Sequence, residues 1–252
     1  MKVAAVQHDI VWQDPAATQR RLIPMIAQAA AAGARLIVLA EMYATGFSMD
    51  TELIAEEQGG PSEQFLISTA ARHGVWLVVS LPQRWSATGR PRNTGLVVSP
   101  DGAVHRYAKR HLFSYGEEHK HYEPGESSLT VNVEGLSVSL FICYDLRFAD
   151  KLWALAPQTD CYIVVANWPE SRREHWRTLL AARAIENQAY VVGVNRVGAD
   201  PKLTYAGDSR IIDPAGRVLA EASYGETVLT AEVSAEEVTQ LRQHFPFVAD
   251  RL

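Results

Sequence analysis

The stretch Leu36-Ile37-Val38-Leu39-Ala40-Glu41 is an unbroken apolar run that ends on an acidic residue. Such a run is typical of a β-strand that is covered on both faces, as in a parallel sheet lying between helices. The segment before it, Pro15–Ala32, predicts a helix, because Asp14 can cap its first turn and Gly33 follows its last turn. A helix that leads into a fully buried strand predicts an α/β fold.

The same alternation continues along the chain. Further strands are predicted at Met1–Gln7, Val75–Leu81, Ser137–Ile142, Tyr162–Ala166 and Tyr190–Asn195. Further helices are predicted at Ser62–His73, with Ser62 as the cap behind Pro61, at Glu174–Asn187, and briefly from Phe148. No low-complexity segment or linker separates these elements, so residues 1–252 are expected to form one domain of mixed sheets with helices outside them.

Two hairpins give the chain an internal symmetry. Thr94–Ser99 is predicted to pair with Ala103–Tyr107, and Ser209–Asp213 with Arg217–Glu221, each pair joined by a Pro-x-Gly turn. Residues 97–104 also match residues 211–218 position by position in character. The match predicts two similar α/β halves, each ending in a hairpin, although a turn design that arose twice would explain it as well.

Composition narrows the class of protein. The 252 residues are 47% hydrophobic and 21% charged, which is enough apolar material for a core and excludes global disorder. The net charge of −5 argues against a nucleic-acid partner, because phosphate binding normally needs a basic face. Two cysteines cannot build a disulfide framework or a four-cysteine zinc site. Since no apolar stretch has the length of a signal peptide core or a membrane span, we expect a cytoplasmic protein without membrane partners.

Chemically useful residues follow three of the predicted strands. Glu41 comes directly after the first apolar run, Cys143 after Ser137–Ile142, and Asn167-Trp168-Pro169 after Tyr162–Ala166. Because ligand sites in α/β sheets form beyond the carboxyl ends of the strands, we expect these residues to line one cleft.

Each candidate also has a structural explanation. Cys143 is a possible nucleophile presented at a sharp turn, but many cysteines are buried packing residues, as Cys161 is expected to be. Glu41 could serve as a general base or could face solvent at a strand end. Lys109, just past the first hairpin, could stabilise an oxyanion or belong to a solvated basic cluster with its neighbours Arg106 and Arg110.

The polar stretch at residues 117–123 raises a rival interpretation. His119 and His121 would share a face if the segment were extended, and together with nearby carboxylates they could bind zinc. The spacing matches no known zinc signature, and a hydrogen-bonded loop explains the stretch equally well. Glycine-rich phosphate loops, dinucleotide fingerprints and a Gly-x-Ser-x-Gly elbow are absent from the sequence.

Three motifs, in this chain order, resemble the catalytic motifs of the nitrilase superfamily of carbon–nitrogen hydrolases: Glu41-Met42-Tyr43-Ala44-Thr45-Gly46-Phe47, Lys109-Arg110-His111-Leu112-Phe113 and Cys143-Tyr144-Asp145-Leu146-Arg147-Phe148. The likeness covers essentially the whole chain. It implies a four-layer αββα sandwich of two mixed sheets flanked by helices, usually assembled as a homodimer. The C-terminal stretch Gln240–Leu252, with Phe245 and Phe247, would suit the dimer interface or fold onto its own chain.

The resemblance also implies a mechanism without a metal or other cofactor. Glu41 would act as the base, Cys143 as the nucleophile, and Lys109 with the backbone N–H of Tyr144 as the oxyanion donors. Glu118 matches the family's second glutamate, which supports the lysine.

The third motif and Asn167-Trp168-Pro169 are most similar to the ω-amidase branch, which hydrolyses dicarboxylate monoamides such as 2-oxoglutaramate. A cation should then bind the free carboxylate, and Arg147, Arg172 and Arg173 are the candidates nearest to the motifs. Four aromatic residues are expected to shape the cleft: Tyr43, Phe113, Tyr144 and Trp168. Other linear amides, N-carbamoyl amines, nitriles, or a catalytically silent binding protein on the same fold remain alternatives.

Overall fold

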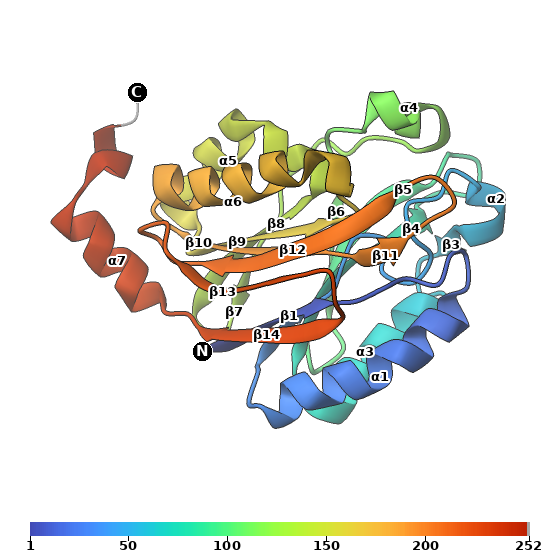
Figure 1. Cartoon of the computed structure of the whole chain (residues 1–252), viewed down its shortest axis with the longest axis horizontal. Coiled ribbons are helices and arrows are strands. Elements are labelled where there is room, and N and C mark those ends of the chain that lie inside the picture. The colour runs from blue at the N-terminus through green and yellow to red at the C-terminus, as the bar shows by residue number, and fades with distance from the viewer. Residues whose placement is uncertain (251–252) are drawn as a thin grey trace.

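The computed structural model describes residues 1–250, and two seven-stranded mixed sheets form its centre (Figure 1). In the first sheet the strand order is β14-β1-β2-β4-β5-β6, with β3 beside β4. Its strands are β1 (Lys2–Gln7), β2 (Leu36–Val38), β3 (Glu56–Glu57), β4 (Trp76–Arg84), β5 (Arg92–Val98), β6 (Val104–Ala108) and β14 (Thr227–Glu232).

The second sheet has the order β11-β12-β10-β9-β8-β7, with β13 beside β12. Its strands are β7 (Thr130–Val133), β8 (Leu136–Ile142), β9 (Cys161–Ala166), β10 (Tyr190–Asn195), β11 (Val197–Ala199), β12 (Thr204–Ile212) and β13 (Val218–Ser223). The helices are α1 (Pro15–Ala31), α2 (Thr51–Ile54), α3 (Pro61–His73), α4 (Glu118–His121), α5 (Ala149–Leu155), α6 (Arg173–Asn187) and α7 (Ala235–His244).

Three apolar clusters join these elements into four layers. The largest lies between the two sheets, where side chains such as Val3 and Val38 of the first sheet meet Leu140 and Ile163 of the second. A second cluster packs α1 and α3 against the outer face of the first sheet, and a third packs α5 and α6 against the second. Figure 1 shows the two helix pairs on opposite sides of the sheets. The predicted αββα sandwich is confirmed.

The internal symmetry predicted from the sequence is also present. Parallel strands β1, β2 and β4 continue into the antiparallel hairpin β5–β6, and parallel strands β8, β9 and β10 continue into β12–β13. The matching stretches at residues 97–104 and 211–218 are the turns of these two hairpins. Strand β14 follows β13 of the second sheet along the chain but pairs with β1, so it returns the chain to the first sheet.

Some local boundaries follow the predicted signals and others differ; strand β12, for example, begins at Thr204 and not at Ser209. Helix α1 begins as expected, since Asp14 accepts a hydrogen bond from the backbone N–H of Ala17 at 2.9 Å. Helix α3 starts at Pro61 behind Gly60, and Ser62, predicted as its cap, instead donates to Glu56 at 2.6 Å. Strand β2 is shorter than predicted and ends at Val38, although the N–H of Leu39 still donates to Val78 O at 2.8 Å, and the Glu41 side chain then reaches Asn167 after β9.

Candidate active site

Cys143 lies at a strained turn directly after β8. Its φ is +46°, a left-handed conformation that costs a residue with a side chain about 1–3 kcal/mol and that persists only where neighbours enforce it. Asp145 supplies that restraint, because its carboxylate accepts the backbone N–H of Ile142 at 3.1 Å and the hydroxyl of Tyr107 at 2.8 Å. The turn from Cys143 to Arg147 therefore presents the thiol at the end of the strand.

Glu41 is completely buried, and every oxygen of its carboxylate has a partner. Oε1 accepts from Lys109 Nζ at 2.9 Å and from Asn93 Nδ2 at 2.8 Å, while Oε2 accepts from the backbone N–H of Asn167 at 2.8 Å. A buried carboxylate held by three donors has one orientation, so Glu41 is fixed relative to the end of β9.

Lys109 follows β6 and lies between two buried carboxylates. Its Nζ is 2.9 Å from Glu41 Oε1 and 3.0 Å from Glu118 Oε2. Glu118, at the start of α4, also accepts the backbone N–H of Phe113 at 2.6 Å. The structure thus brings together four residues that the sequence places in separate motifs: Glu41, Lys109, Glu118 and Cys143.

Burial and charge act in opposite directions on this cluster. Burial alone would lower the pKa of Lys109, but the Glu118 and Glu41 carboxylates outweigh it and raise the pKa above its usual value. Burial raises the pKa of Glu118, an effect that Lys109 opposes and Glu41 reinforces. Lys109 is therefore a permanent cation, and it balances only one of the two carboxylates beside it.

The Cys143 thiol lies next to this excess negative charge. Burial raises its pKa well above the ordinary value, the Glu41 carboxylate raises it further, and Lys109 opposes the rise. The resting site therefore holds a neutral thiol with a carboxylate ready to receive its proton.

The rate at which iodoacetamide alkylates Cys143 measures the fraction of thiolate, since only the thiolate reacts. The alkylation rate of Cys143 is expected to rise with pH through its elevated pKa. Glu41→Gln removes the negative charge, so the pKa should fall and the rate profile should move to lower pH. Glu117→Gln is the matched control, because Glu117 also lines the pocket but is paired with Lys120. A profile that is unchanged or moves to higher pH in Glu41→Gln would contradict this electrostatic description.

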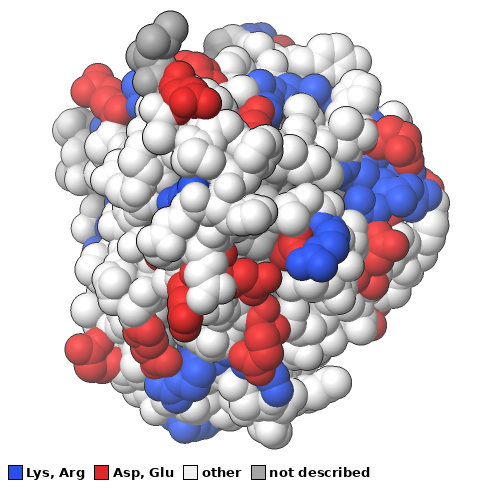
Figure 2. All heavy atoms as spheres, turned by 90° about the vertical axis from the view of Figure 1, so that its left-hand side faces the viewer, with Lys and Arg blue, Asp and Glu red and all other residues white. Residues whose placement is uncertain are grey.

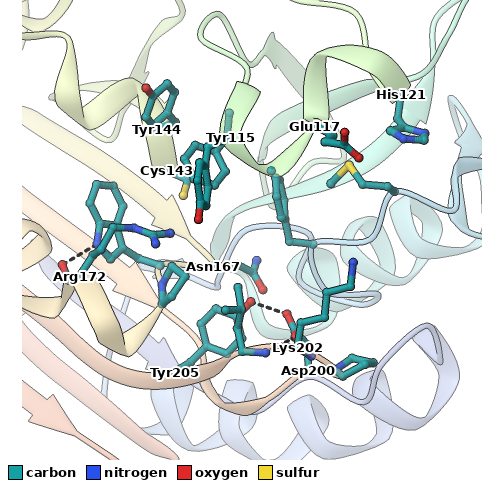
Figure 3. Close-up of a pocket in the computed structure, with 18 of the residues that line it drawn as sticks. Tyr115, Glu117, His121, Cys143, Tyr144, Asn167, Arg172, Asp200, Lys202 and Tyr205 are labelled. Atoms are coloured by element: carbon teal, nitrogen blue, oxygen red, sulfur yellow. Dashed lines mark hydrogen bonds between the residues drawn. The ribbon is translucent and has the colours of Figure 1, made fainter.

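The thiol opens into a pocket of about 510 Å³, a size that suits a small ligand (Figure 3). Its walls combine aromatic and charged side chains from several loops: Trp12, Phe47, Phe113, Tyr115, Tyr144, Arg147, Trp168, Arg172, Lys202 and Tyr205. Arg147 stacks over Trp168 at 4.7 Å, and Arg172 lies over the ring of Phe113 at 5.5 Å.

Five of the seven aromatic and arginine positions predicted to shape the cleft or bind the carboxylate line this pocket, but Tyr43 and Arg173 do not. Tyr43 is fully buried in the core beneath α1 and α3, where it stacks on Phe65 and its hydroxyl donates to Ser62 O at 2.8 Å. Its place beside Glu41 in the sequence is misleading, because Met42, at φ +42°, turns the chain between them. Arg173 also lies outside the pocket lining and pairs with Asp208 at 2.8 Å.

Sequence reasoning missed the role of two asparagines. Asn93 donates to both Glu41 and Glu118, and its own Oδ1 accepts the Ser80 hydroxyl, which in turn accepts the N–H of Met42. Asn93 sits inside a strand, so no local signal marks it. Asn167 is predicted to line the cleft, but its two contacts with Glu41 have no local signal in the sequence.

The histidines of the rival zinc interpretation are not on an extended segment. Residues 118–121 form the short helix α4, so His119 and His121, two positions apart, point in different directions. His121 lines the pocket, while the backbone carbonyl of His119 accepts a hydrogen bond from Arg90. The acidic part of this stretch instead supplies Glu118 to Lys109.

Comparison with known proteins agrees with this geometry. The family model "Carbon-nitrogen hydrolase" matches residues 2–243. The chain is 38% identical to the omega-amidase YafV of Yersinia enterocolitica, covering 99% of this chain and 96% of the relative. It is 33% identical to a 2-oxoglutaramate amidase of Bacillus subtilis, covering 98% and 96%.

A solved structure gives the same result for the fold. A CN-hydrolase superfamily protein from Xanthomonas campestris, which carries an arsenic adduct in its active site, is 37% identical with a TM-score of 0.93, covering 100% of this chain and 97% of that one. The protein described here belongs to the carbon–nitrogen hydrolase family.

Proposed function

We propose that this enzyme hydrolyses the terminal amide of small dicarboxylate monoamides, of the 2-oxoglutaramate type, to the acid and ammonia. The observation that carries the substrate class is the charge of the pocket. Arg147, Arg172 and Lys202 line it, and none of the three forms an ion pair with a carboxylate within residues 1–250. The names of the curated relatives support the same class.

The two acids of the pocket wall leave these cations available. Glu117 is paired with Lys120, and Asp200 accepts the hydroxyl of Tyr205 and the backbone N–H groups of Lys202 and Leu203. A pocket with spare positive charge near its aromatic walls favours a small substrate with a free carboxylate.

The acylation half of the reaction uses the buried cluster. Glu41 takes the thiol proton as Cys143 Sγ bonds to the amide carbon, and the carbonyl electron pair moves onto oxygen. Lys109 and the backbone N–H of Tyr144 stabilise that oxyanion, and each such donor is worth a factor of about a hundred or more in rate. The C–N bond then breaks as Glu41 returns the proton to nitrogen, which releases ammonia and leaves a thioester on Cys143.

The deacylation half runs the same path with water. Glu41 takes a proton from water as the water oxygen attacks the thioester carbon. The C–S bond then breaks as Glu41 returns the proton to sulfur. Glu118 keeps Lys109 in place through both halves by its two contacts with Nζ. The steps need only these side chains and water, and we propose no cofactor.

Substrate selectivity tests the proposed pocket charge. Arg172→Gln is expected to lower kcat/KM for 2-oxoglutaramate by about 10- to 100-fold, because a charge-assisted hydrogen bond to the carboxylate is lost. In the same variant, kcat/KM for butyramide, which has no carboxylate, should change by less than about threefold. Arg173→Gln is the matched control, since Arg173 is the next residue but pairs with Asp208 outside the pocket lining.

Two other results would contradict the proposed substrate class or the proposed role of the arginines. If the wild-type enzyme prefers butyramide, an N-carbamoyl amine or a nitrile over 2-oxoglutaramate, the carboxylate is not part of recognition. If Arg172→Gln and Arg173→Gln lower both activities equally, the arginines support the fold and do not select the substrate.

The homodimer, the cytoplasmic location and the lack of a nucleic-acid partner stay predictions. Helix α7 extends from the body of the molecule, and the Phe245 side chain after it is 60% exposed, which supports an interface there (Figure 1). Residues 251 and 252 of the predicted interface stretch lie outside the described residues.

On the face drawn in Figure 2, basic and acidic side chains are interspersed and do not form one basic surface. No helix within residues 1–250 is long and apolar enough to cross a membrane.

A further inference from the structure

Asn167, the first residue after β9, is held more tightly than a pocket residue needs for packing alone. Its backbone N–H donates to Glu41 Oε2 at 2.8 Å, and its side-chain Nδ2 donates to the backbone carbonyl of Glu41 at 2.5 Å. The side chain is 4% exposed and lines the pocket together with Cys143. Figure 3 shows it among the labelled pocket residues.

The next residue is fixed as well. Asn195 accepts the backbone N–H of Trp168 at 2.7 Å and donates back to the Trp168 carbonyl at 3.0 Å. Asn167 is therefore anchored on one side by Glu41 and on the other through Trp168, and its side chain cannot rotate without breaking these contacts.

This anchoring leaves one polar atom of Asn167 without a hydrogen-bond partner within residues 1–250. Because Nδ2 is committed to a carbonyl, which can only accept, the amide orientation of Asn167 is fixed and Oδ1 points the other way. Oδ1 is buried and has no hydrogen-bond donor among residues 1–250. Buried polar atoms nearly always have a partner. The other such atoms belong to residues that do not line the pocket: Arg92, Arg177, Gln188, Arg196, Arg210 and Arg242.

We propose that Asn167 Oδ1 accepts an N–H of the scissile amide and thereby selects amides over esters of the same acid. The inference rests on the proposed function and adds a residue that recognises the leaving group. A carbonyl oxygen can accept from the NH₂ of an amide, whereas the alkoxy oxygen of an ester has no hydrogen to donate. Holding one N–H also directs the nitrogen lone pair toward Glu41, the group that protonates the departing ammonia.

Asn167 has a second role that the test must separate from the first. It supports Glu41, and Glu41 serves every substrate that forms the thioester. Loss of Asn167 should therefore slow all reactions through Glu41, but it should slow amide hydrolysis more. The informative quantity is the ratio of kcat/KM for 2-oxoglutaramate, measured as ammonia release, to kcat/KM for the matching 5-methyl ester, measured as methanol release.

The Asn167→Ala enzyme is expected to lose about tenfold or more in this amide-to-ester ratio, the effect of one hydrogen bond. Asn167→Asp keeps an acceptor oxygen at the position of Oδ1, so its ratio should stay within about threefold of wild type even if both rates fall. Asn195→Ala is the matched control. It loosens the same segment through Trp168 without lining the pocket, and its ratio should equal that of wild type.

An equal loss of amide and ester activity in Asn167→Ala would overturn the proposal and leave Asn167 as a support for Glu41 only. A drop in the ratio for Asn195→Ala as large as for Asn167→Ala would overturn it too, since loosening of the segment would then explain the effect. Wild-type enzyme that hydrolyses the ester but releases no ammonia from 2-oxoglutaramate would reject the proposed function and this inference with it.

Discussion

Cys143→Ala is expected to fold like the wild-type protein and to lose at least about 10⁴-fold in kcat/KM for amide hydrolysis. The loss is large because the substitution removes the only atom that we propose forms the thioester. The fold should survive, because the turn at Cys143 is held by Asp145 contacts that the substitution leaves in place. A change of about 1 kcal/mol in the free energy of unfolding is the expected scale.

Cys161→Ala provides the matched control for this prediction. Cys161 is the other cysteine of the chain and lies fully buried in β9, within the core between the sheets. Its removal should lower the melting temperature slightly and leave kcat/KM within a few-fold of wild type. A Cys143→Ala protein that unfolds would show that Cys143 is a structural residue, and one that folds and keeps its activity would show that Cys143 is not the nucleophile.

Lys109→Met should have the largest effect on stability. It leaves two fully buried carboxylates, Glu41 and Glu118, without the cation that lies about 3 Å from both. Breaking a buried ion pair in this way costs about 3–5 kcal/mol, and for a chain of this size that lowers the melting temperature by on the order of 10 °C. Activity should be lost as well, since the oxyanion donor is gone.

The pH dependence of that loss identifies its cause. Without Lys109, the pKa of Glu118 in the folded protein rises further above its unfolded value. The folded state then binds the proton more tightly, so the stability deficit should shrink as pH falls and grow as pH rises through the raised pKa. Calorimetry at several pH values measures this. Lys120→Met is the control, because Lys120 forms an exposed pair with Glu117 and should change the melting temperature little. A Lys109→Met deficit that is absent or independent of pH would contradict the buried-charge explanation.

Much of the fold and the site follows from local signals in the sequence. The apolar runs at Leu36–Ala40, Ser137–Ile142 and Tyr162–Ala166 predict buried strands. The ends of β8 and β9 meet because parallel neighbours share one edge, whereas β2 belongs to the other sheet and Glu41 after it is joined to the end of β9 by its contacts with Asn167. Lys109 could be placed because it follows a recognisable hairpin. Glu118 could be placed only through the resemblance to a known family, because nothing in its own surroundings marks it as a buried partner.

The remaining features depend on tertiary contacts that no local pattern encodes. Asn93 bridges two glutamates from the start of β5, and the unpaired oxygen of Asn167 depends on where its amide nitrogen is bound. Tyr43 is predicted to shape the cleft, but the turn at Met42, between Glu41 and Tyr43, sends it into the core. Side-chain direction after a strained residue cannot be derived from spacing alone.

The most direct test of the account is ammonia release from 2-oxoglutaramate by the wild-type enzyme and by Cys143→Ala, measured side by side. We predict steady release by the wild type and no release above background by the variant, which would establish a cysteine-dependent amidase for dicarboxylate monoamides. No release by either protein would remove the proposed substrate. Equal release by both would show that Cys143 is not the nucleophile, and the mechanism described above would be wrong.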